Sequence, residues 1–296
     1  MSVSTVGVIG AGQMGAGVAQ VAAQAGVSVL LNDVSEELVE RGLQTVGRNL
    51  DRMAERGRFK PEERDRIMRR VSGTANLADL KDTDFVIEAV VEQEEAKIEL
   101  FQKLDKICPA HVIFASNTSS ISITRMGART SRADRFIGMH FMNPVPAMRL
   151  VEIIRGLATS QETFEATRSL AERMGKNTMT AEDFPGFIVN RILLPMINEG
   201  IYTLYEGVGG VTDIDTAMKL GTNQPMGPLE LADLIGLDTC LAIMEVMHRV
   251  FGDDKYRPCP LLKKYVDAGY LGRKAGRGFY TYDKQGNSIA PVTHGR

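Results

Sequence analysis

Hydrophobic positions up to residue 184 form short runs that alternate with longer amphipathic stretches. The runs TVGVIG, VSVLLND, DFVIEAV, VIFAS, RFIGMHF and LVEII are rich in β-branched and aromatic residues, which is typical of buried strands. The stretches between them have helical patterns, and strands that alternate with helices build a doubly wound sheet. We therefore predict an α/β Rossmann domain over residues 1–184.

The charged segment from Ser35 to Arg70 is longer than a simple crossover between strands requires. Turn signals near Gly57 and Pro61 divide it, so it predicts a pair of helices inserted as an excursion from the sheet. After DFPGFIVNR the β-type alternation stops, and helical patterns continue with loop signals at GVGG, NQPMGP and IGLD. We predict an all-α C-terminal domain over residues 185–296.

Charge and cysteine usage narrow the classes of function. The chain of 296 residues has 35 basic and 37 acidic side chains and a net charge of −2, so no global field attracts nucleic acid or anionic membranes. Three cysteines without CxxC spacing argue against a zinc site or disulfide framework and fit a reducing compartment. The start MSVSTVGVIG lacks a signal-peptide pattern, and no apolar run is long enough to span a membrane. We expect a cytoplasmic protein without metal, membrane or nucleic-acid partners.

A glycine pattern occupies the first predicted turn. Gly10, Gly12 and Gly15 form GxGxxG directly after TVGVI and directly before a helical run that starts with Gln13 and Met14. Glycine permits the tight turn and lets backbone N–H groups approach a pyrophosphate at the positive end of the helix. With a strand before it and a helix after it, the motif predicts a dinucleotide cofactor.

Asp33 ends the next predicted strand. An acidic side chain there accepts hydrogen bonds from ribose hydroxyls and repels a 2′-phosphate, and no arginine follows it immediately, so we predict NAD rather than NADP. The alternative is an acidic group near a helix N-terminus beside Ser35. Glu92 and Lys97 follow DFVIEAV at the carboxyl edge of the sheet, where ligands bind; for Lys97 the alternative is a solvated helix charge.

His140 stands in IGMHFMNPVP, between a strand-like run and a rigid turn, and Glu152 follows in LVEII. Oxidation of a secondary alcohol needs a base with a pKa near neutrality as the hydride departs, and histidine supplies one. A carboxylate on the distal ring nitrogen fixes the tautomer and stabilises the imidazolium. Because NPVP imposes a turn, we expect Glu152 to return to His140, and the pattern predicts a hydride-transfer enzyme.

The other histidines lack such a setting. His111 follows CPA ahead of a strand, His248 belongs to a helical pattern, and His294 lies in the tail. For His140 the alternative is a core histidine satisfied by the backbone.

Two polar residues have open alternatives. Ser119 in SNTSS follows the strand VIFAS, where its hydroxyl can bond a substrate oxygen, yet Thr118, Ser119 and Ser120 can equally cap the following helix. Asn190 lies on the apolar face of the first C-terminal helix. A buried amide needs partners, so Asn190 either orients substrate or ties the domains together.

Several segments together resemble the 3-hydroxyacyl-CoA dehydrogenase family, particularly its short bacterial 3-hydroxybutyryl-CoA dehydrogenases. The resemblance covers essentially the whole chain and is carried by GAGQMG, SNTSS, HFMNPVP, LVEII, DFPGFIVNR, GPLELADLIGLD and GRKAGRGFY. It implies reversible oxidation of an (S)-3-hydroxyacyl-CoA to the 3-oxoacyl-CoA with NAD, with 3-hydroxybutyryl-CoA as the expected substrate.

The resemblance also implies roles for individual residues. His140 and Glu152 match the family's catalytic pair, and Ser119 and Asn190 match its substrate-orienting residues. It further implies an NAD site that includes Glu92, Lys97, Asn117 and Asn143. The excursion after Ser35 is implied to bind coenzyme A and the helical domain to form a homodimer.

Arg48, Arg52 and Arg56 recur on one face of the excursion. They can meet the phosphates of coenzyme A, and we take Arg52 and Arg56 as candidate substrate-binding residues. The alternative is an ordinary solvated face, since Asp51 and Glu55 lie nearby.

Two other functions compete with this interpretation. One is an NAD-dependent dehydrogenase of a free hydroxy or sugar acid on the same scaffold. The other is a noncatalytic NAD-binding structural protein, against which the presence of Ser119, His140, Glu152 and Asn190 argues.

Overall fold

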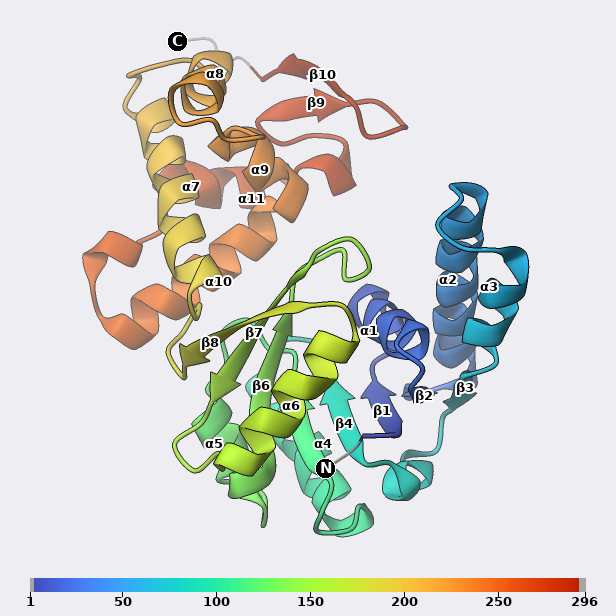
Figure 1. The fold of residues 1–296 in the computed structure, drawn as a ribbon. Helices are drawn as coiled ribbons and strands as arrows, with labels where there is room; N and C mark the ends of the chain where they lie inside the picture. Colours follow the sequence, from blue (N-terminus) through green and yellow to red (C-terminus); the bar gives the residue numbers. More distant parts are fainter. Residues whose placement is uncertain (1–2, 293–296) are drawn as a thin grey trace. The chain divides into compact units, whose positions relative to one another are not determined.

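The computed structural model describes residues 3–292, and the chain divides into two compact units, Met1–Phe187 and Ile188–Arg296. Within the described part of the first unit, eight strands form one sheet in the order β3-β2-β1-β4-β5-β6-β7-β8 (Figure 1). The strands are β1 Thr5–Ile9, β2 Ser28–Asn32, β3 Val71–Thr74, β4 Phe85–Glu88, β5 Ile113–Ser116, β6 Phe136–Phe141, β7 Leu150–Arg155 and β8 Asn177–Glu182. Neighbouring strands are parallel except β6 and β7, which are antiparallel.

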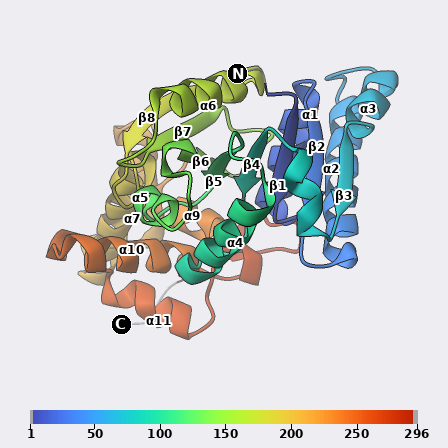
Figure 2. The same cartoon turned by 90° about the horizontal axis from the view of Figure 1, so that it is seen from below.

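Helices cover both faces of this sheet (Figure 2). The helices of the unit are α1 Gln13–Gln24, α2 Glu36–Glu55, α3 Pro61–Met68, α4 Glu94–Ile107, α5 Ile123–Gly127 and α6 Gln161–Arg173. Apolar side chains of α1, α2 and α6 share one core with the sheet, whereas those of α4 and α5 share a second core. The predicted doubly wound fold with an inserted helix pair, here α2 and α3, is confirmed.

The hydrophobic pattern missed the strands β3 and β8. Neither segment, VSGT or NTMTAE, has a hydrophobic run, and most of their side chains are not buried. Both strands lie at the edges of the sheet, where burial on two faces is not required. Backbone pairing to a neighbouring strand, rather than side-chain burial, therefore holds these two segments in the sheet.

The second unit is helical, as predicted. Its helices are α7 Val189–Tyr205, α8 Val211–Gly221, α9 Pro228–Ile235, α10 Leu237–Phe251 and α11 Pro260–Asp267. They enclose a separate apolar core. The prediction of a wholly α-helical domain needs one correction, since β9 Tyr280–Tyr282 and β10 Ser288–Pro291 pair antiparallel. Buried Asp233 of α9 holds β9 by accepting hydrogen bonds from the backbone N–H groups of Phe279 and Tyr280.

Among residues 3–292, none of the helices is long and apolar enough to cross a membrane.

Candidate active site

The central pair of the site is His140 on β6 and Glu152 on β7. The antiparallel register makes these two residues direct partners, so their side chains leave the same face of the sheet. His140 Nδ1 lies 2.8 Å from Glu152 Oε2. His140 is 5% exposed and Glu152 is fully buried. A buried carboxylate against Nδ1 places the proton on that nitrogen, which leaves Nε2 as the acceptor.

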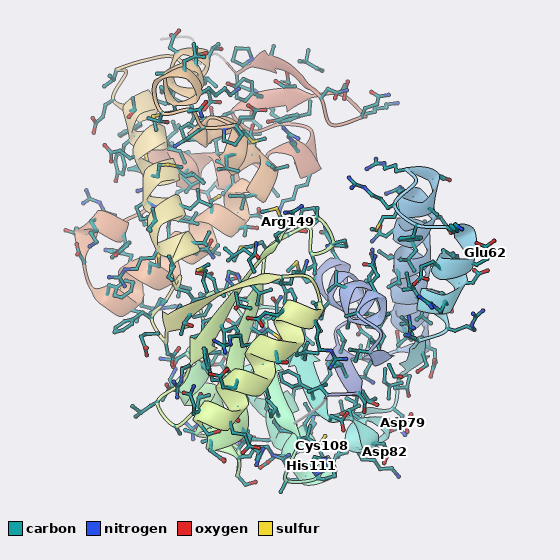
Figure 3. All side chains as sticks on the ribbon, viewed as in Figure 1. Glu62, Asp79, Asp82, Cys108, His111 and Arg149 are labelled. Atoms are coloured by element: carbon teal, nitrogen blue, oxygen red, sulfur yellow. The ribbon has the colours of Figure 1, made fainter. Side chains whose placement is uncertain are left out.

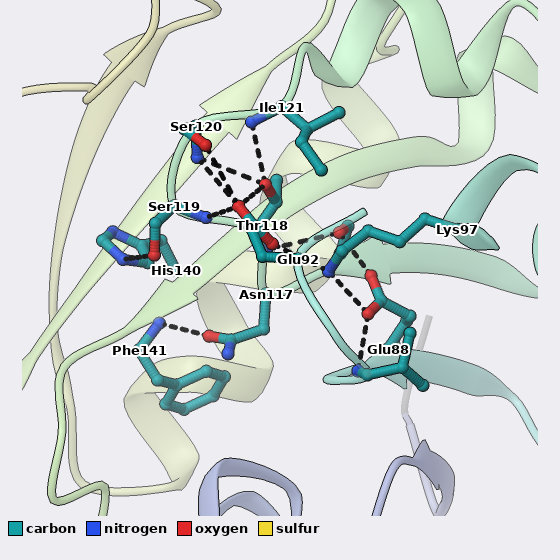
Figure 4. Close-up of polar contacts among 12 residues, drawn as sticks. Glu88, Glu92, Lys97, Asn117, Thr118, Ser119, Ser120, Ile121, His140 and Phe141 are labelled. Atoms are coloured by element: carbon teal, nitrogen blue, oxygen red, sulfur yellow. Dashed lines mark hydrogen bonds and ion pairs between the residues drawn. The ribbon is translucent and has the colours of Figure 1, made fainter. Parts of the chain in front are cut away.

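Ser119 lies on the other side of the imidazole. Its Oγ is 3.0 Å from His140 Nε2, in the loop that follows β5 (Figure 4). The alternative that Thr118, Ser119 or Ser120 caps the next helix is wrong, because the N-cap of α5 is Ser122, whose side chain accepts the N–H of Arg125. Ser119 is therefore available to the histidine.

These three side chains form one line of hydrogen bonds, from the hydroxyl of Ser119 through the imidazole to the carboxylate of Glu152. Nε2 can take a proton from an alcohol, and the resulting imidazolium is stabilised by the carboxylate behind it. The arrangement can therefore perform general base catalysis on a hydroxyl group that binds beside Ser119.

The loop after β6 carries Asn143 and is fastened at several points. Asn117, in the loop after β5, accepts the backbone N–H of Phe141 with its Oδ1 at 2.8 Å. Lys176 donates its ammonium to the carbonyl oxygens of Val145 at 2.5 Å and Met148 at 2.8 Å. Burial lowers the pKa of Lys176. These contacts fix the loop that presents Asn143, which is itself exposed.

Glu92 accepts several hydrogen bonds from the loop that contains Ser119. Its Oε1 accepts hydrogen bonds from Thr118 Oγ1 at 2.6 Å, Ser119 N at 2.8 Å and Ser120 N at 3.2 Å. Desolvation works to raise the pKa of Glu92, but the positive charge of Lys97 and the hydrogen bonds from Thr118 and Ser119 outweigh it. The pKa of Glu92 therefore lies below its usual value.

Lys97 of α4 is 1% exposed, so the alternative of a solvated helix charge is wrong. Its Nζ lies 2.7 Å from Glu88 Oε1 and 3.1 Å from Glu92 Oε2. The ammonium is thus neutralised by two carboxylates within the protein.

The glycine turn between β1 and α1 requires glycine at two positions. Gly10 has φ of +96°, and a Cβ there would lie 2.5 Å from the carbonyl oxygen of Ala89. A Cβ on Gly15 would lie 1.7 Å from the carbonyl oxygen of Gly10. Gly12, the N-cap residue of α1, is different, because a Cβ there would meet nothing within 4 Å. Space is therefore open at the helix N-terminus.

That N-terminus suits an anion. No side chain caps α1, and its first turn contains no acidic residue, so the helix itself supplies no carboxylate to its positive pole. Gln13 is exposed and Met14 half-buried at its start. These features fit the pyrophosphate of a dinucleotide, which the backbone N–H groups would hold.

Asp33 follows β2 directly and lies beside this turn. Its Oδ2 accepts the N–H of Ala11 at 2.7 Å, which links the end of β2 to the glycine turn. Ser35, two residues further on, is the residue that caps α2, because its side chain accepts the N–H of Leu38. The half-buried carboxylate fits a ribose diol next to the pyrophosphate position.

Other candidate residues belong to other elements. Asn190 is the second residue of α7 and is half-buried, and Arg52 and Arg56 are exposed at the carboxyl end of α2. His111 precedes β5, and Figure 3 shows it at the end of the sheet opposite Arg149 in the β6–β7 loop. His248 is in α10, and His294 lies outside the described residues.

The sequence patterns missed three residues of this site: Glu88, Ser116 and Lys176. Glu88 and Ser116 end strands β4 and β5 and are fully buried. A polar residue at the carboxyl end of a strand is a signal that would have found both, as it did for Asp33. Lys176 had no such signal, since a lysine just after a helix is usually solvated.

A resident metal has no obvious place. No group of three or more His, Cys, Asp or Glu side chains among the described residues is arranged to hold one.

Two family models match this chain. The NAD binding domain of 3-hydroxyacyl-CoA dehydrogenase matches residues 5–184, and the C-terminal domain of 3-hydroxyacyl-CoA dehydrogenase matches residues 186–282.

Individual proteins are similar over nearly the whole chain. A 3-hydroxybutyryl-CoA dehydrogenase of Bradyrhizobium diazoefficiens is 58% identical over 95% of this chain and 96% of its own length. A probable 3-hydroxybutyryl-CoA dehydrogenase of Bacillus subtilis is 56% identical over 96% of this chain and 99% of its own. The crystal structure of (S)-3-hydroxybutyryl-CoA dehydrogenase from Ralstonia eutropha has a TM-score of 0.93 at 51% identity, covering 96% and 100% of the two chains.

The glycine turn gives a matched pair of variants. Gly12→Ala adds a methyl group into open space, so we expect it to fold normally and to weaken NADH binding by about tenfold or more, as a lost contact of about 1.4 kcal/mol would do. Gly15→Ala drives a methyl group into the Gly10 carbonyl and should lower the melting temperature. Fluorescence titration with NADH and thermal unfolding check both. Unchanged NADH affinity in Gly12→Ala would contradict the placement of the pyrophosphate.

Proposed function

The chain belongs to the 3-hydroxyacyl-CoA dehydrogenase family, and on that premise we propose that it oxidises (S)-3-hydroxybutyryl-CoA through Ser119, His140 and Glu152. Membership makes it an NAD-dependent oxidoreductase of 3-hydroxyacyl-CoA substrates. The proposal for the individual residues rests on one observation, the continuous hydrogen-bonded line from Ser119 Oγ to Glu152 Oε2.

His140 acts as the base in this mechanism. Its Nε2 takes the proton of the C3 hydroxyl, and Glu152 stabilises the imidazolium through Nδ1. The hydroxyl of Ser119, already next to Nε2, turns to the substrate oxygen and holds it in line with the acceptor nitrogen. NAD supplies the acceptor for the hydride that leaves C3. In the reverse direction His140 returns the proton to the oxygen of the 3-oxo group.

We propose further that Gly10, Gly12, Gln13, Met14, Gly15, Asp33, Glu92, Lys97, Asn117 and Asn143 form the NAD site. The open space at Gly12 and the uncapped N-terminus of α1 support the pyrophosphate position, and Asp33 supports NAD over NADP. The fixed loop that carries Asn143 supports a contact to the nicotinamide end.

We propose that residues 185–296 form the substrate and dimerisation domain, with Asn190 orienting the acyl-CoA. For coenzyme A itself, Arg52 and Arg56 are the candidates. They are exposed one helical turn apart, and neither has an ion pair within 4.0 Å among the described residues, so both guanidinium groups are available to phosphates.

A cytoplasmic location is proposed from the cysteines. All three are free and buried, and burial raises the pKa of Cys108 to about 11 and that of Cys240 to about 12. Three free thiols without a disulfide among them suit a reducing compartment.

Turnover of acetoacetyl-CoA tests the substrate and the cofactor together. We expect NADH absorbance to fall rapidly with purified protein and acetoacetyl-CoA. Free acetoacetate should give no turnover because the CoA contacts are lost, and NADPH should be poor because Asp33 repels its 2′-phosphate. Turnover of the free acid at a comparable rate would instead favour a hydroxy-acid dehydrogenase.

Replacement of His140 tests the base. His140→Ala should lower kcat by roughly 10²- to 10⁴-fold, the usual contribution of general base catalysis, with little change in the Kd for NADH. Glu152→Gln should lower kcat less, by about 10- to 100-fold, because a neutral amide replaces the carboxylate that stabilises the imidazolium. His111→Ala, at the opposite end of the sheet, serves as the matched control. Wild-type turnover in His140→Ala would exclude it as the base.

Dimerisation is supported by apolar surface on the helical unit. Val208 is 76% and Leu220 is 82% exposed, and a pocket of about 450 Å³ between α7 and α8 is lined by side chains that include Met196, Ile214 and Met218. Sedimentation velocity should give about twice the chain mass of 32.4 kDa. Leu220→Glu, which charges this surface, should shift the protein toward monomer; a monomeric wild-type protein would contradict the proposal.

A further inference from the structure

A buried ionic network lies beneath the loop that carries Ser119 (Figure 4). Lys97, which is 1% exposed, bridges Glu88, which is fully buried, and Glu92, which is partly exposed. Two carboxylates and one ammonium leave a net charge of −1 in this network. Burial of charged groups is costly in free energy, and an apolar replacement of similar size is often at least as stable. A contribution to stability is therefore a weak explanation of these three side chains.

At one end the network holds the Ser119 loop. Beyond its bonds to Thr118 and to the N–H groups of Ser119 and Ser120, Glu92 Oε1 also accepts Ser120 Oγ at 3.3 Å. One carboxylate oxygen thus organises the turn around Ser119. Because Ser119 N donates directly to Glu92, a displacement of Glu92 moves the residue whose hydroxyl contacts His140.

At the other end the network is anchored in the sheet. Glu88 is the last residue of β4 and is the direct strand partner of Ser116, the last residue of β5. Its Oε1 accepts Val90 N and Lys97 Nζ, both at 2.7 Å, and its Oε2 accepts Ser116 Oγ at 2.6 Å. Both carboxylate oxygens of Glu88 are therefore fixed by hydrogen bonds. Lys97 contacts Glu92 as well, so it links Glu92 to this fixed carboxylate.

We propose that Glu88 is a positioning residue for catalysis, which acts through Lys97 and Glu92 to fix Ser119 Oγ against His140 Nε2. The inference rests on the proposed roles of Ser119 and His140. Glu88 reaches the reacting atoms only through its partners, so its loss should lower the kcat of the folded protein, and the size of this loss should depend on the Ser119 hydroxyl. A merely structural Glu88 would change thermal stability and leave kcat of the folded protein intact.

A double-mutant cycle between Glu88 and Ser119 separates the two roles. Glu88→Gln keeps the size of the side chain but removes its charge, so Lys97 is drawn toward Glu92. Turnover of acetoacetyl-CoA with NADH is measured for the wild type, Glu88→Gln, Ser119→Ala and the double variant. Glu94→Gln is the control, since it removes an ion pair of the same helix, to Arg125, at the surface.

We expect Glu88→Gln to lower kcat by about five- to tenfold, within the range of coupling between contacting residues, and Glu94→Gln to retain it. In the Ser119→Ala background, Glu88→Gln should have no further effect, because the hydroxyl that it positions is gone. An equal loss in both backgrounds, or an unchanged kcat in Glu88→Gln, would overturn the inference. A wild-type kcat in Ser119→Ala would instead refute the proposed role of Ser119.

If Glu88→Gln does not fold, Ser116→Ala can replace it in the same double-mutant cycle. It removes the hydroxyl that donates to Glu88 Oε2 and also accepts the N–H of Thr118 at 3.3 Å, and it leaves all charges in place. A smaller loss of kcat that disappears in the Ser119→Ala background supports the inference, and a loss that persists there contradicts it.

Discussion

The antiparallel pairing of β6 with β7 is the constraint on which the site depends. All other pairs of neighbouring strands in this sheet are parallel. Because β7 runs back along β6, residues twelve positions apart in the chain become strand partners. His140 and Glu152 are thereby locked on one face by backbone hydrogen bonds rather than by the conformations of two flexible loops. The imidazole and its carboxylate are thus held in place by the sheet, and preorganisation of this kind reduces the reorganisation that a reaction requires.

The remaining parts of the site reach this pair from the carboxyl ends of parallel strands. Ser119 comes from the end of β5, the ionic network from the end of β4, and the dinucleotide turn from the end of β1. Loops at this edge are free to carry polar groups because the strands beneath them are buried and rigid. Charged groups inside the site are paired locally. The imidazole of His140 is hydrogen-bonded to Glu152, and Lys97 forms ion pairs with Glu88 and Glu92.

The sequence predicted those features that leave a local pattern. Buried strands such as TVGVI and helical runs were visible, and so was the glycine spacing at Gly10, Gly12 and Gly15. Edge strands β3 and β8 were not visible, because they are held by backbone pairing. Spacing alone left Ser119 ambiguous, and the structure identifies Ser122 as the helix cap. The burial of Lys97 could not be predicted from the local pattern either, because it depends on an ion pair with Glu88, nine residues earlier in the chain.

The central claim is that Ser119, His140 and Glu152 work as one unit in proton transfer. The most direct measurement is the single-turnover rate of NADH formation after NAD-loaded protein is mixed with saturating (S)-3-hydroxybutyryl-CoA. It compares the wild type, the single variant H140A and the triple variant S119A/H140A/E152Q. The account predicts about the same rate for the single and triple variants, because residues that act as a unit have strongly non-additive effects. A triple variant with a much lower single-turnover rate than H140A would show that the three residues contribute independently, which would contradict the account.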